Sequence, residues 1–293
     1  MYDVKSLKAT EFISKYVVIG VLEMGEWRFP SNDYGEIKGI NDTGIAMFSG
    51  TPLQSLAREV CQNSLDASAN KKTTIVEFNL FQLDCFKVPG RAYLLDAFTR
   101  GQEFWKKQNS KQTEQFLKNA NKSLSEEIFC DVLRISDHNT TGLLGSDGEI
   151  NTDWTNLTKS SGASDKSASA GGSFGIGKFA PFACSKFNTV FYSTYDQNNK
   201  KAYQGVTRLV TFNDKNNNQT QGIGYFGEER NKPIIGQANF DENYKRSPKD
   251  YGTDIYIFGF KFSNEDWKKD IIVSILDGFL GALWRGKLEI KIE

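Results

Sequence analysis

The chain has 293 residues, with 36 lysines and arginines against 36 aspartates and glutamates, so its formal net charge is zero. A protein whose whole surface binds nucleic acid or an anionic membrane carries a clear basic excess, and this balance excludes that class. The hydrophobic fraction is 39 %, but 13 % of the residues are aromatic and 22 are Phe, which predicts a core of large rings in one large domain or two small ones.

The first half of the chain predicts three helices and two strands after an irregular beginning. Residues 1–50 are rich in turn-forming residues and predict an irregular N-terminal arm. Thr51 followed by Pro52 marks a helix start, and apolar residues at helical spacing predict a helix over Pro52–Ala69. The β-branched and aromatic residues of Thr73–Leu83 predict a strand. Further helices are predicted over Arg91–Gln108 and Gln112–Ile128, and a second strand over Phe129–Ser136.

The second half begins with a segment that has no core-forming side chains. Residues 160–173 are small and polar and predict a mobile loop. A helix is predicted over Phe174–Cys184, and Asn-rich turns then indicate antiparallel hairpins. The predicted elements after that helix are strands over Thr189–Tyr195, Ala202–Phe212, Ile223–Phe226 and Thr253–Phe260, a helix over Asn264–Trp284 and a final alternating strand, LEIKIE.

That final strand has no visible partner in the sequence, so we expect the chain to be part of a longer protein. The most apolar stretch, Ile271–Trp284, contains Asp277 and is shorter than the roughly 20 residues that a membrane span needs. No secretory leader opens the chain, and a cytoplasmic protein that does not enter the membrane is expected.

Cysteine and histidine usage narrows the chemistry. Cys61, Cys85, Cys130 and Cys184 form no CxxC pair, so they predict reduced thiols rather than a zinc or redox motif. His138 is the single histidine, which excludes a His-rich metal site.

Three patterns carry possible site chemistry. Glu59, Asn63 and Asp66 lie on one stripe that borders the apolar face of the first helix, although such a stripe alone is typical of any amphipathic helix. Asp137 ends a strand and is followed by a loop with Gly142, which is also a common turn pattern. The third pattern is the glycine-rich run Gly172–Lys178 at a helix start, where exposed backbone N–H groups can bind phosphate.

The glycine-rich run fits two better-known nucleotide motifs only in part. It matches the GxxxxGK of a P-loop, but Phe179 stands where a Ser or Thr hydroxyl must hold Mg²⁺. It also matches the GxGxxA of a dinucleotide fold from Gly175 to Ala180. Both motifs require a hydrophobic strand just upstream, and the residues there are small and polar.

The order of these motifs resembles the four signature boxes of the GHKL, or Bergerat-fold, ATPases, which include gyrase, MutL, MORC proteins, histidine kinases and the ninety-kilodalton heat-shock chaperone. The matching segments are REVCQNSLDA from Arg58 to Ala67, Asp137 with Gly142, GGSFGIGK, and Gly252-Thr253 before the last core strand. The second box departs from the family's DxGxG, since DHNTTG lacks the first glycine and is one residue longer. The resemblance implies an α/β (α+β) two-layer sandwich, with a mostly antiparallel mixed sheet and helices on one face.

The resemblance also implies roles for individual residues. Glu59 would be the general base, Asn63 would hold Mg²⁺, and Asp137 would accept the adenine amine with support from Thr253. Asp66 would be structural or lie on the adenine side, and Ala67 and Gly142 would belong to the ATP-binding residues. Gly172, Gly175 and Gly177 would wrap the triphosphate, with Ser173, Phe174 and Ile176 in the same loop and Lys178 as a charge partner.

By the same resemblance, the implied domains are an arm over 1–50, an ATP-binding domain over 51–262 with a lid over 160–173, and a connecting helix with the first strand of a transducer-like element over 263–293. The implied function is a slow, Mg²⁺-dependent ATPase whose lid closure and ATP-dependent homodimerisation gate a DNA or effector partner. A likeness to MORC-like bacterial ATPases, carried also by Gly39–Ile45, suggests restriction or phage defence.

Two alternative functions stay open: a nucleotide-binding switch without turnover, and a kinase acting on a separate protein. His138, inside the nucleotide loop, argues against phosphorylation within the chain.

Overall fold

The computed structural model of the chain describes residues 25–69, 72–148, 150–160, 177–262 and 266–293. Residues 1–24 of the expected N-terminal arm and nearly all of the expected lid lie outside these ranges. The same holds for five predicted loop residues, Gly172, Ser173, Phe174, Gly175 and Ile176.

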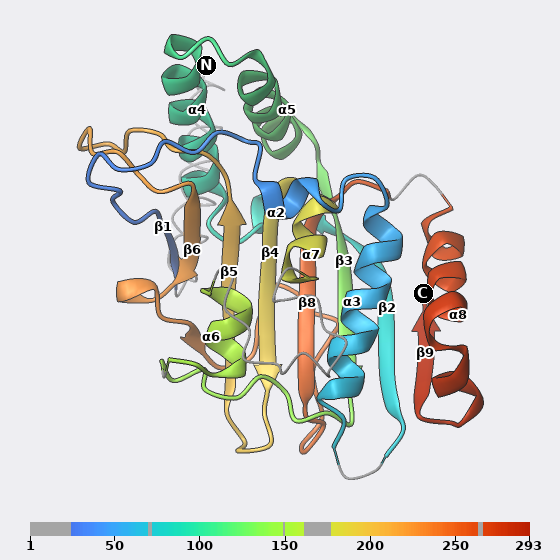
Figure 1. The fold of residues 1–293 in the computed structure, drawn as a ribbon. Helices are drawn as coiled ribbons and strands as arrows, with labels where there is room; N and C mark the ends of the chain where they lie inside the picture. The colour runs from blue at the N-terminus through green and yellow to red at the C-terminus, as the bar shows by residue number, and fades with distance from the viewer. Residues whose placement is uncertain (1–24, 70–71, 149, 161–176, 263–265) are drawn as a thin grey trace, which may run out of the picture.

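A nine-stranded, mostly antiparallel sheet forms the centre of the molecule (Figure 1), as the sequence predicted. Its order is β1-β6-β5-β4-β8-β3-β2-β9, with β7 paired to β5, and only β2 and β9 run parallel. The strands are β1 (Glu26–Arg28), β2 (Thr74–Asp84), β3 (Phe129–His138), β4 (Ser185–Tyr195), β5 (Lys201–Arg208), β6 (Ile223–Gly227), β7 (Ile234–Ile235), β8 (Gly252–Phe260) and β9 (Leu288–Ile292).

Seven α-helices occur in the described ranges, and with the sheet they make the fold mixed α/β, or α+β. They are α2 (Thr43–Ala46), α3 (Pro52–Asp66), α4 (Arg91–Lys107), α5 (Lys111–Glu126), α6 (Asp153–Thr158), α7 (Ala180–Ala183) and α8 (Trp267–Trp284), with 3₁₀ turns η1 (Cys85–Lys87), η2 (Gly177–Phe179) and η3 (Glu229–Asn231). None of these helices combines the length and the apolarity that crossing a bilayer requires.

Helices cover both faces of the sheet, so the expectation of helices on one face alone is wrong. Side chains alternate along each strand, and both sets are apolar here. On β4, Val190 and Tyr192 pack with α6 and α7, whereas Phe191 points to the opposite face and joins the cluster of α4 and α5. α3 and α8 share the first face with β2, β3 and β8.

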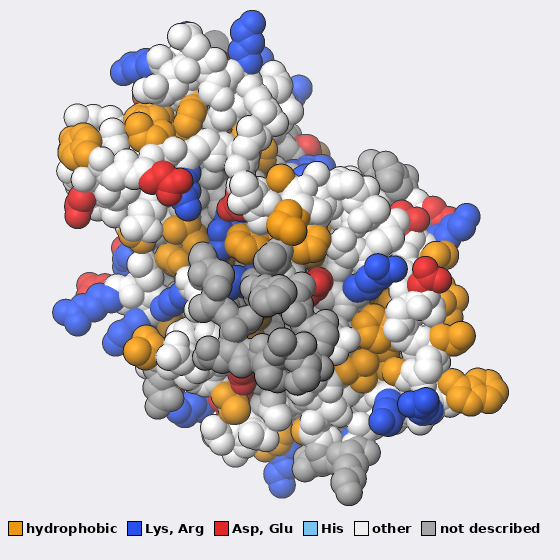
Figure 2. Space-filling model, viewed as in Figure 1, with side chains coloured by type: hydrophobic (Ala, Val, Ile, Leu, Met, Phe, Trp, Pro, Cys, Tyr) orange, Lys and Arg blue, Asp and Glu red, His pale blue; other side chains and the backbone are white. Residues whose placement is uncertain are grey.

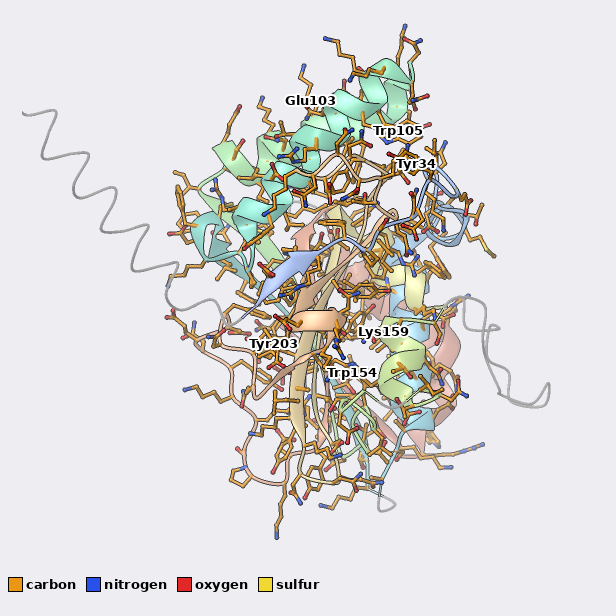
Figure 3. The ribbon with its side chains drawn as sticks, turned by 90° about the vertical axis from the view of Figure 1, so that its left-hand side faces the viewer. Tyr34, Glu103, Trp105, Trp154, Lys159 and Tyr203 are labelled. Carbon is orange, nitrogen blue, oxygen red and sulfur yellow. The ribbon has the colours of Figure 1, made fainter. Side chains whose placement is uncertain are left out.

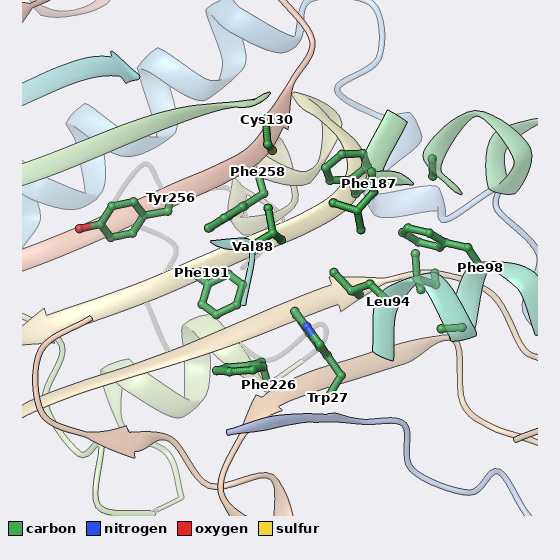
Figure 4. Close-up of a cluster of buried hydrophobic side chains, with 14 of the residues drawn as sticks. Trp27, Val88, Leu94, Phe98, Cys130, Phe187, Phe191, Phe226, Tyr256 and Phe258 are labelled. Atoms are coloured by element: carbon green, nitrogen blue, oxygen red, sulfur yellow. The ribbon is translucent and has the colours of Figure 1, made fainter. Parts of the chain in front are cut away.

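The second face is built from large rings, as the composition predicted (Figure 4). Phe191 lies at its centre, with ring centroids 5.6 Å from Trp27, 5.3 Å from Phe226 and 5.0 Å from Phe258. Most of these pairs are tilted or edge-on, the arrangement that aromatic quadrupoles favour. Trp27 belongs to β1, so a strand of the region expected to be irregular closes this core.

Residues 266–293 depart from the expected domain organisation. β9 was expected to begin a separate, transducer-like element, but it pairs in parallel with β2 and extends the same sheet. Leu288 of β9 is buried in the cluster that α3 and α8 form with the sheet. The two strands are far apart in sequence, since Thr74 pairs with Leu288, which is why the alternating pattern of β9 alone did not reveal its partner.

All four cysteines are free, as predicted, and the structure also buries each of them. Burial raises the pKa of the Cys61 and Cys184 thiols to about 12, so both are protonated and unreactive at neutral pH.

Candidate nucleotide-binding site

Helix α3 carries the first group of predicted site residues. Its apolar face is buried against the sheet, and Glu59, Asn63 and Asp66 follow the border of that face, as the spacing predicted. Glu59 is half-buried, whereas Asn63 and Asp66 are exposed. Asp66 accepts a hydrogen bond of 2.8 Å from Gln62 of the same helix, so its carboxylate is turned along the surface of α3.

Asp137 is a buried carboxylate that is hydrogen-bonded to this helix and to two other segments. It is 9 % exposed and accepts hydrogen bonds from three different segments of the chain. Oδ1 accepts from Thr140 Oγ1 at 2.7 Å and from the Thr253 amide at 2.8 Å, and Oδ2 accepts from Ser64 Oγ at 3.1 Å. Burial raises the pKa of this carboxyl, although the nearby Arg246 charge and the hydrogen bonds oppose the rise.

Gly252 and Thr253, at the start of β8, fit closely against Asp137. A Cβ at position 252 would overlap the backbone oxygen of Asp137 and lie 2.8 Å from its Oδ1, so only glycine permits this approach. Arg246 fixes the same region from the other side: its Nη2 donates to the Asp137 carbonyl oxygen at 2.8 Å and pairs with Asp254 at 2.7 Å.

The loop after β3 is joined directly to the end of α3. The Thr141 amide donates to the Ala67 carbonyl oxygen at 2.9 Å, and Ala69 donates to Asn139 at 2.9 Å. These bonds end α3 at Asp66, three residues before the predicted end. Gly142 has φ +65°, and a Cβ there would lie 2.7 Å from the Tyr195 carbonyl oxygen. The longer DHNTTG loop therefore still brings its glycine to the sheet beside Asp137.

Gly177 is the last glycine of the glycine-rich run. Of the residues in this run, the structure describes Gly177 and Lys178. Gly177 opens η2, and a Cβ at this position would overlap the carboxylate of Glu59. The backbone at Gly177 therefore lies directly against the carboxylate of Glu59, the predicted general base. The predicted helix over Phe174–Cys184 is reduced, within the described residues, to η2 and the short α7, because Pro181 and the turn at Cys184 leave room for one turn only.

The Lys178 side chain reaches back to Asn156 and to Ser160, the first residue of the expected lid. The lysine is 9 % exposed, and Nζ donates to the carbonyl oxygens of Asn156, at 2.8 Å, and Ser160. Burial, and then the neighbouring Arg208 charge, lowers the pKa of this ammonium to about 8. These two carbonyl groups belong to α6 and to the residues that follow it. The sequence did not predict α6. Figure 3 labels Trp154 and Lys159 of this segment.

Arg208 is a second cation close to Lys178, and it is half-buried. Its guanidinium lies over the Phe179 ring at 4.2 Å and pairs with Asp42 at 3.1 Å. The Arg208 Nε is buried without a hydrogen-bond partner among the described residues. Asp42 also caps α2, and a Cβ at Gly44 would overlap the Phe179 ring, so the Gly39–Ile45 motif packs against this cation.

His138 lies at the rim of the site rather than within it. Its Nδ1 is 2.7 Å from Asp250 Oδ1. Burial opposes ionisation of Asp250, but the hydrogen bond from His138 and the Arg246 charge outweigh it and lower the pKa of this carboxyl.

Three residues of the site were missed at the sequence level. Ser64 had a visible signal, because it is a polar residue on the buried stripe of α3 between Val60 and Ala67. Thr140 and Arg208 had no such signal, since a threonine in a loop and an arginine at a strand end are common.

A scan against protein-family models found no match, and a search of curated proteins found no similar sequence.

Proposed function

We propose that this chain is a Mg²⁺-dependent ATP-binding and ATP-hydrolysing module with the Bergerat fold of the GHKL superfamily. One observation carries the proposal: a single helix, α3, contacts both ends of the candidate site. Its Ser64 hydrogen-bonds the buried Asp137, and its Glu59 lies against Gly177 of the glycine-rich run. Segments that are distant in sequence thus meet at this helix, which supports a site for ATP between them.

Asp137 has the bonding capacity that adenine recognition requires. An ionised carboxylate offers about four acceptor positions, and three are used by Thr140, Thr253 and Ser64. Oδ2 accepts only one of these bonds and retains a position for the exocyclic amine of adenine. Guanine presents a carbonyl oxygen at the corresponding position, which would face the carboxylate unfavourably. The carboxylate therefore favours ATP over GTP.

Glu59 and Asn63 supply the groups that hydrolysis needs. Glu59 is half-buried beside the phosphate-binding backbone, where a carboxylate can take a proton from the attacking water. Within the described residues, no three His, Cys, Asp or Glu side chains gather as a metal cage. Mg²⁺ in nucleotide sites is held by one or two protein oxygens together with phosphate oxygens and water, and the exposed Asn63 amide, one turn from Glu59, fits that ligand set. When bound, the ion would neutralise charge on the phosphates.

Lys178 and Arg208 provide positive charge where the triphosphate would end. Burial of Lys178 and then repulsion by the half-buried Arg208 lower the pKa of this lysine, and a bound polyanion would relieve that repulsion. The buried Nε of Arg208 is a further donor for a phosphate oxygen. Lid closure, ATP-dependent homodimerisation and the gating of a DNA or effector partner, with a role in restriction or phage defence, extend the proposal by resemblance to the family.

The test is a calorimetric titration of the protein with Mg·ATP and Mg·GTP, followed by an assay of phosphate release. We expect ATP to bind and GTP to bind at least about tenfold more weakly, since one bidentate or charged contact contributes about 1–3 kcal/mol. Asp137→Asn should lose this preference, and Asp131→Asn, on the same strand, is the matched control. Absence of nucleotide binding would refute the proposal, whereas binding without phosphate release would indicate the switch or the kinase.

A further inference from the structure

The outer edge of the sheet exposes an apolar surface that the nucleotide site does not use. We define the edge patch as β9 together with the outer face of α8. The side chains of Ile272, Val273, Leu276, Leu280 and Trp284 are between 44 % and 89 % exposed. Figure 2 shows hydrophobic side chains gathered on this side of the molecule, at the right of the view. Clusters of this kind on a folded surface mark interaction sites.

Helix α8 is apolar on two faces, and only one of them is covered in this chain. Its inner face packs on α3 and the sheet through Trp267, Ile271, Ile275 and Phe279. Helices that are apolar all round are normally buried on all sides. A groove of about 310 Å³ runs between the outer face of α8 and β9, lined by Ile272, Ile275, Leu276, Leu283, Ile290 and Ile292. The outer face of α8 and the edge strand therefore form one continuous surface.

β9 ends the sheet with one side open. It pairs with β2, and no strand among the described residues pairs with its other side. An open edge next to an apolar groove invites a further strand, which would add backbone hydrogen bonds to apolar contacts.

The charges of β9 are complementary to those of a second, antiparallel copy of the same strand. If two copies pair antiparallel about Ile290, Leu288 lies opposite Ile292 and Glu289 lies opposite Lys291 of the second copy, twice over by symmetry. Glu289 and Lys291 are exposed, while Ile290 and Ile292 are half-buried against the groove. The same twofold axis, perpendicular to the sheet, keeps both α8 helices on one face and turns their apolar sides toward each other.

We propose that a second copy of this chain covers the edge patch, through antiparallel pairing of β9 with β9 and packing of α8 against α8. The interface is independent of nucleotide and lies at the sheet edge rather than at the lid. It does not depend on the proposed ATPase activity.

Sedimentation equilibrium of the nucleotide-free protein tests the interface by charge exchange. Lys291→Glu and Glu289→Lys each place like charges opposite each other at two positions, and each should raise the dimer dissociation constant by about tenfold or more. The double variant E289K/K291E restores both opposite pairs and should dimerise like the parent protein. An equimolar mixture of the two single variants should form heterodimers.

Leu276→Glu, in the groove, should also give monomers, whereas Ile128→Glu is a matched control because that isoleucine is 72 % exposed at a distant position. Circular dichroism of each variant verifies folding. A parent protein that stays monomeric at all concentrations would overturn the proposal. A dimer that survives both Lys291→Glu and Leu276→Glu would do the same. Because nucleotide is absent, neither result bears on ATP binding.

Discussion

Lys178 allows a quantitative test of the proposed triphosphate site, because its protonation should change when ATP binds. In the nucleotide-free protein, burial and the Arg208 charge lower the pKa of Lys178 from 10.5 to about 8. A bound triphosphate stabilises the ammonium and should return its pKa toward the ordinary value. The difference corresponds to about 3 kcal/mol of interaction between the charged lysine and the ligand.

The sign follows from the lowered pKa. Below pH 7 Lys178 is charged with or without ATP, so binding takes up almost no proton. At pH 8 the free lysine is about half neutral, and binding should take up about 0.5 proton; at pH 9 the uptake should approach about 0.9. The ATP affinity is therefore greatest below pH 8 and falls as the pH rises, at a rate approaching tenfold per pH unit.

Calorimetric titrations at pH 8, in buffers of different ionisation enthalpy, measure this proton uptake directly. Lys178→Met should abolish the uptake and weaken ATP binding. Lys178→Arg keeps a charge at every accessible pH, so it should bind ATP without taking up a proton. The reasoning is refuted if the parent protein binds ATP with no proton uptake at pH 8, or if Lys178→Met takes up as many protons as the parent.

Three further variants separate binding from turnover. Glu59→Ala should bind ATP normally but release phosphate about 100-fold more slowly, because the proton acceptor is gone; undiminished release would remove Glu59 from the reaction. Asn63→Ala should weaken binding of Mg·ATP but not of ATP in the presence of a chelator, and equal effects on both would exclude a metal ligand. Gly177→Ala would place a methyl group on the Glu59 carboxylate. It should slow phosphate release and cost about 1–3 kcal/mol of stability in urea unfolding, while an unchanged turnover would show that Glu59 does not act beside this backbone.

Local patterns predicted most of the regular elements, and they placed the ends of these elements only to within a few residues. α3, β2, α4 and α5 begin and end within a few residues of their predicted ranges, because apolar periodicity and the Thr51-Pro52 start are local signals. Thr51 nevertheless makes no capping hydrogen bond, so Pro52 is the feature that marks the start of α3. The short β1 and α6 were missed, because three to six residues carry too little periodicity to be recognised.

The candidate site was predictable where a residue's own type limits its chemistry. Glu59, Asn63, Asp137 and Gly177 were selected from carboxylates, an amide and a glycine at motif spacing, and the structure places all four near α3. Ser64 and Arg208 acquire their roles only from partners that are distant in sequence: 73 residues separate Ser64 from Asp137, and 166 separate Arg208 from Asp42.

The sequence by itself determined the aromatic core, the mostly antiparallel sheet and the residue types available for nucleotide chemistry, because these depend on composition and short-range periodicity. Only the tertiary structure decided that helices cover both faces of the sheet, that β9 joins β2, and that Lys178 lies beside a second cation. Each of these depends on contacts between distant segments, and the free energy of such a contact is a property of the pair rather than of either segment alone.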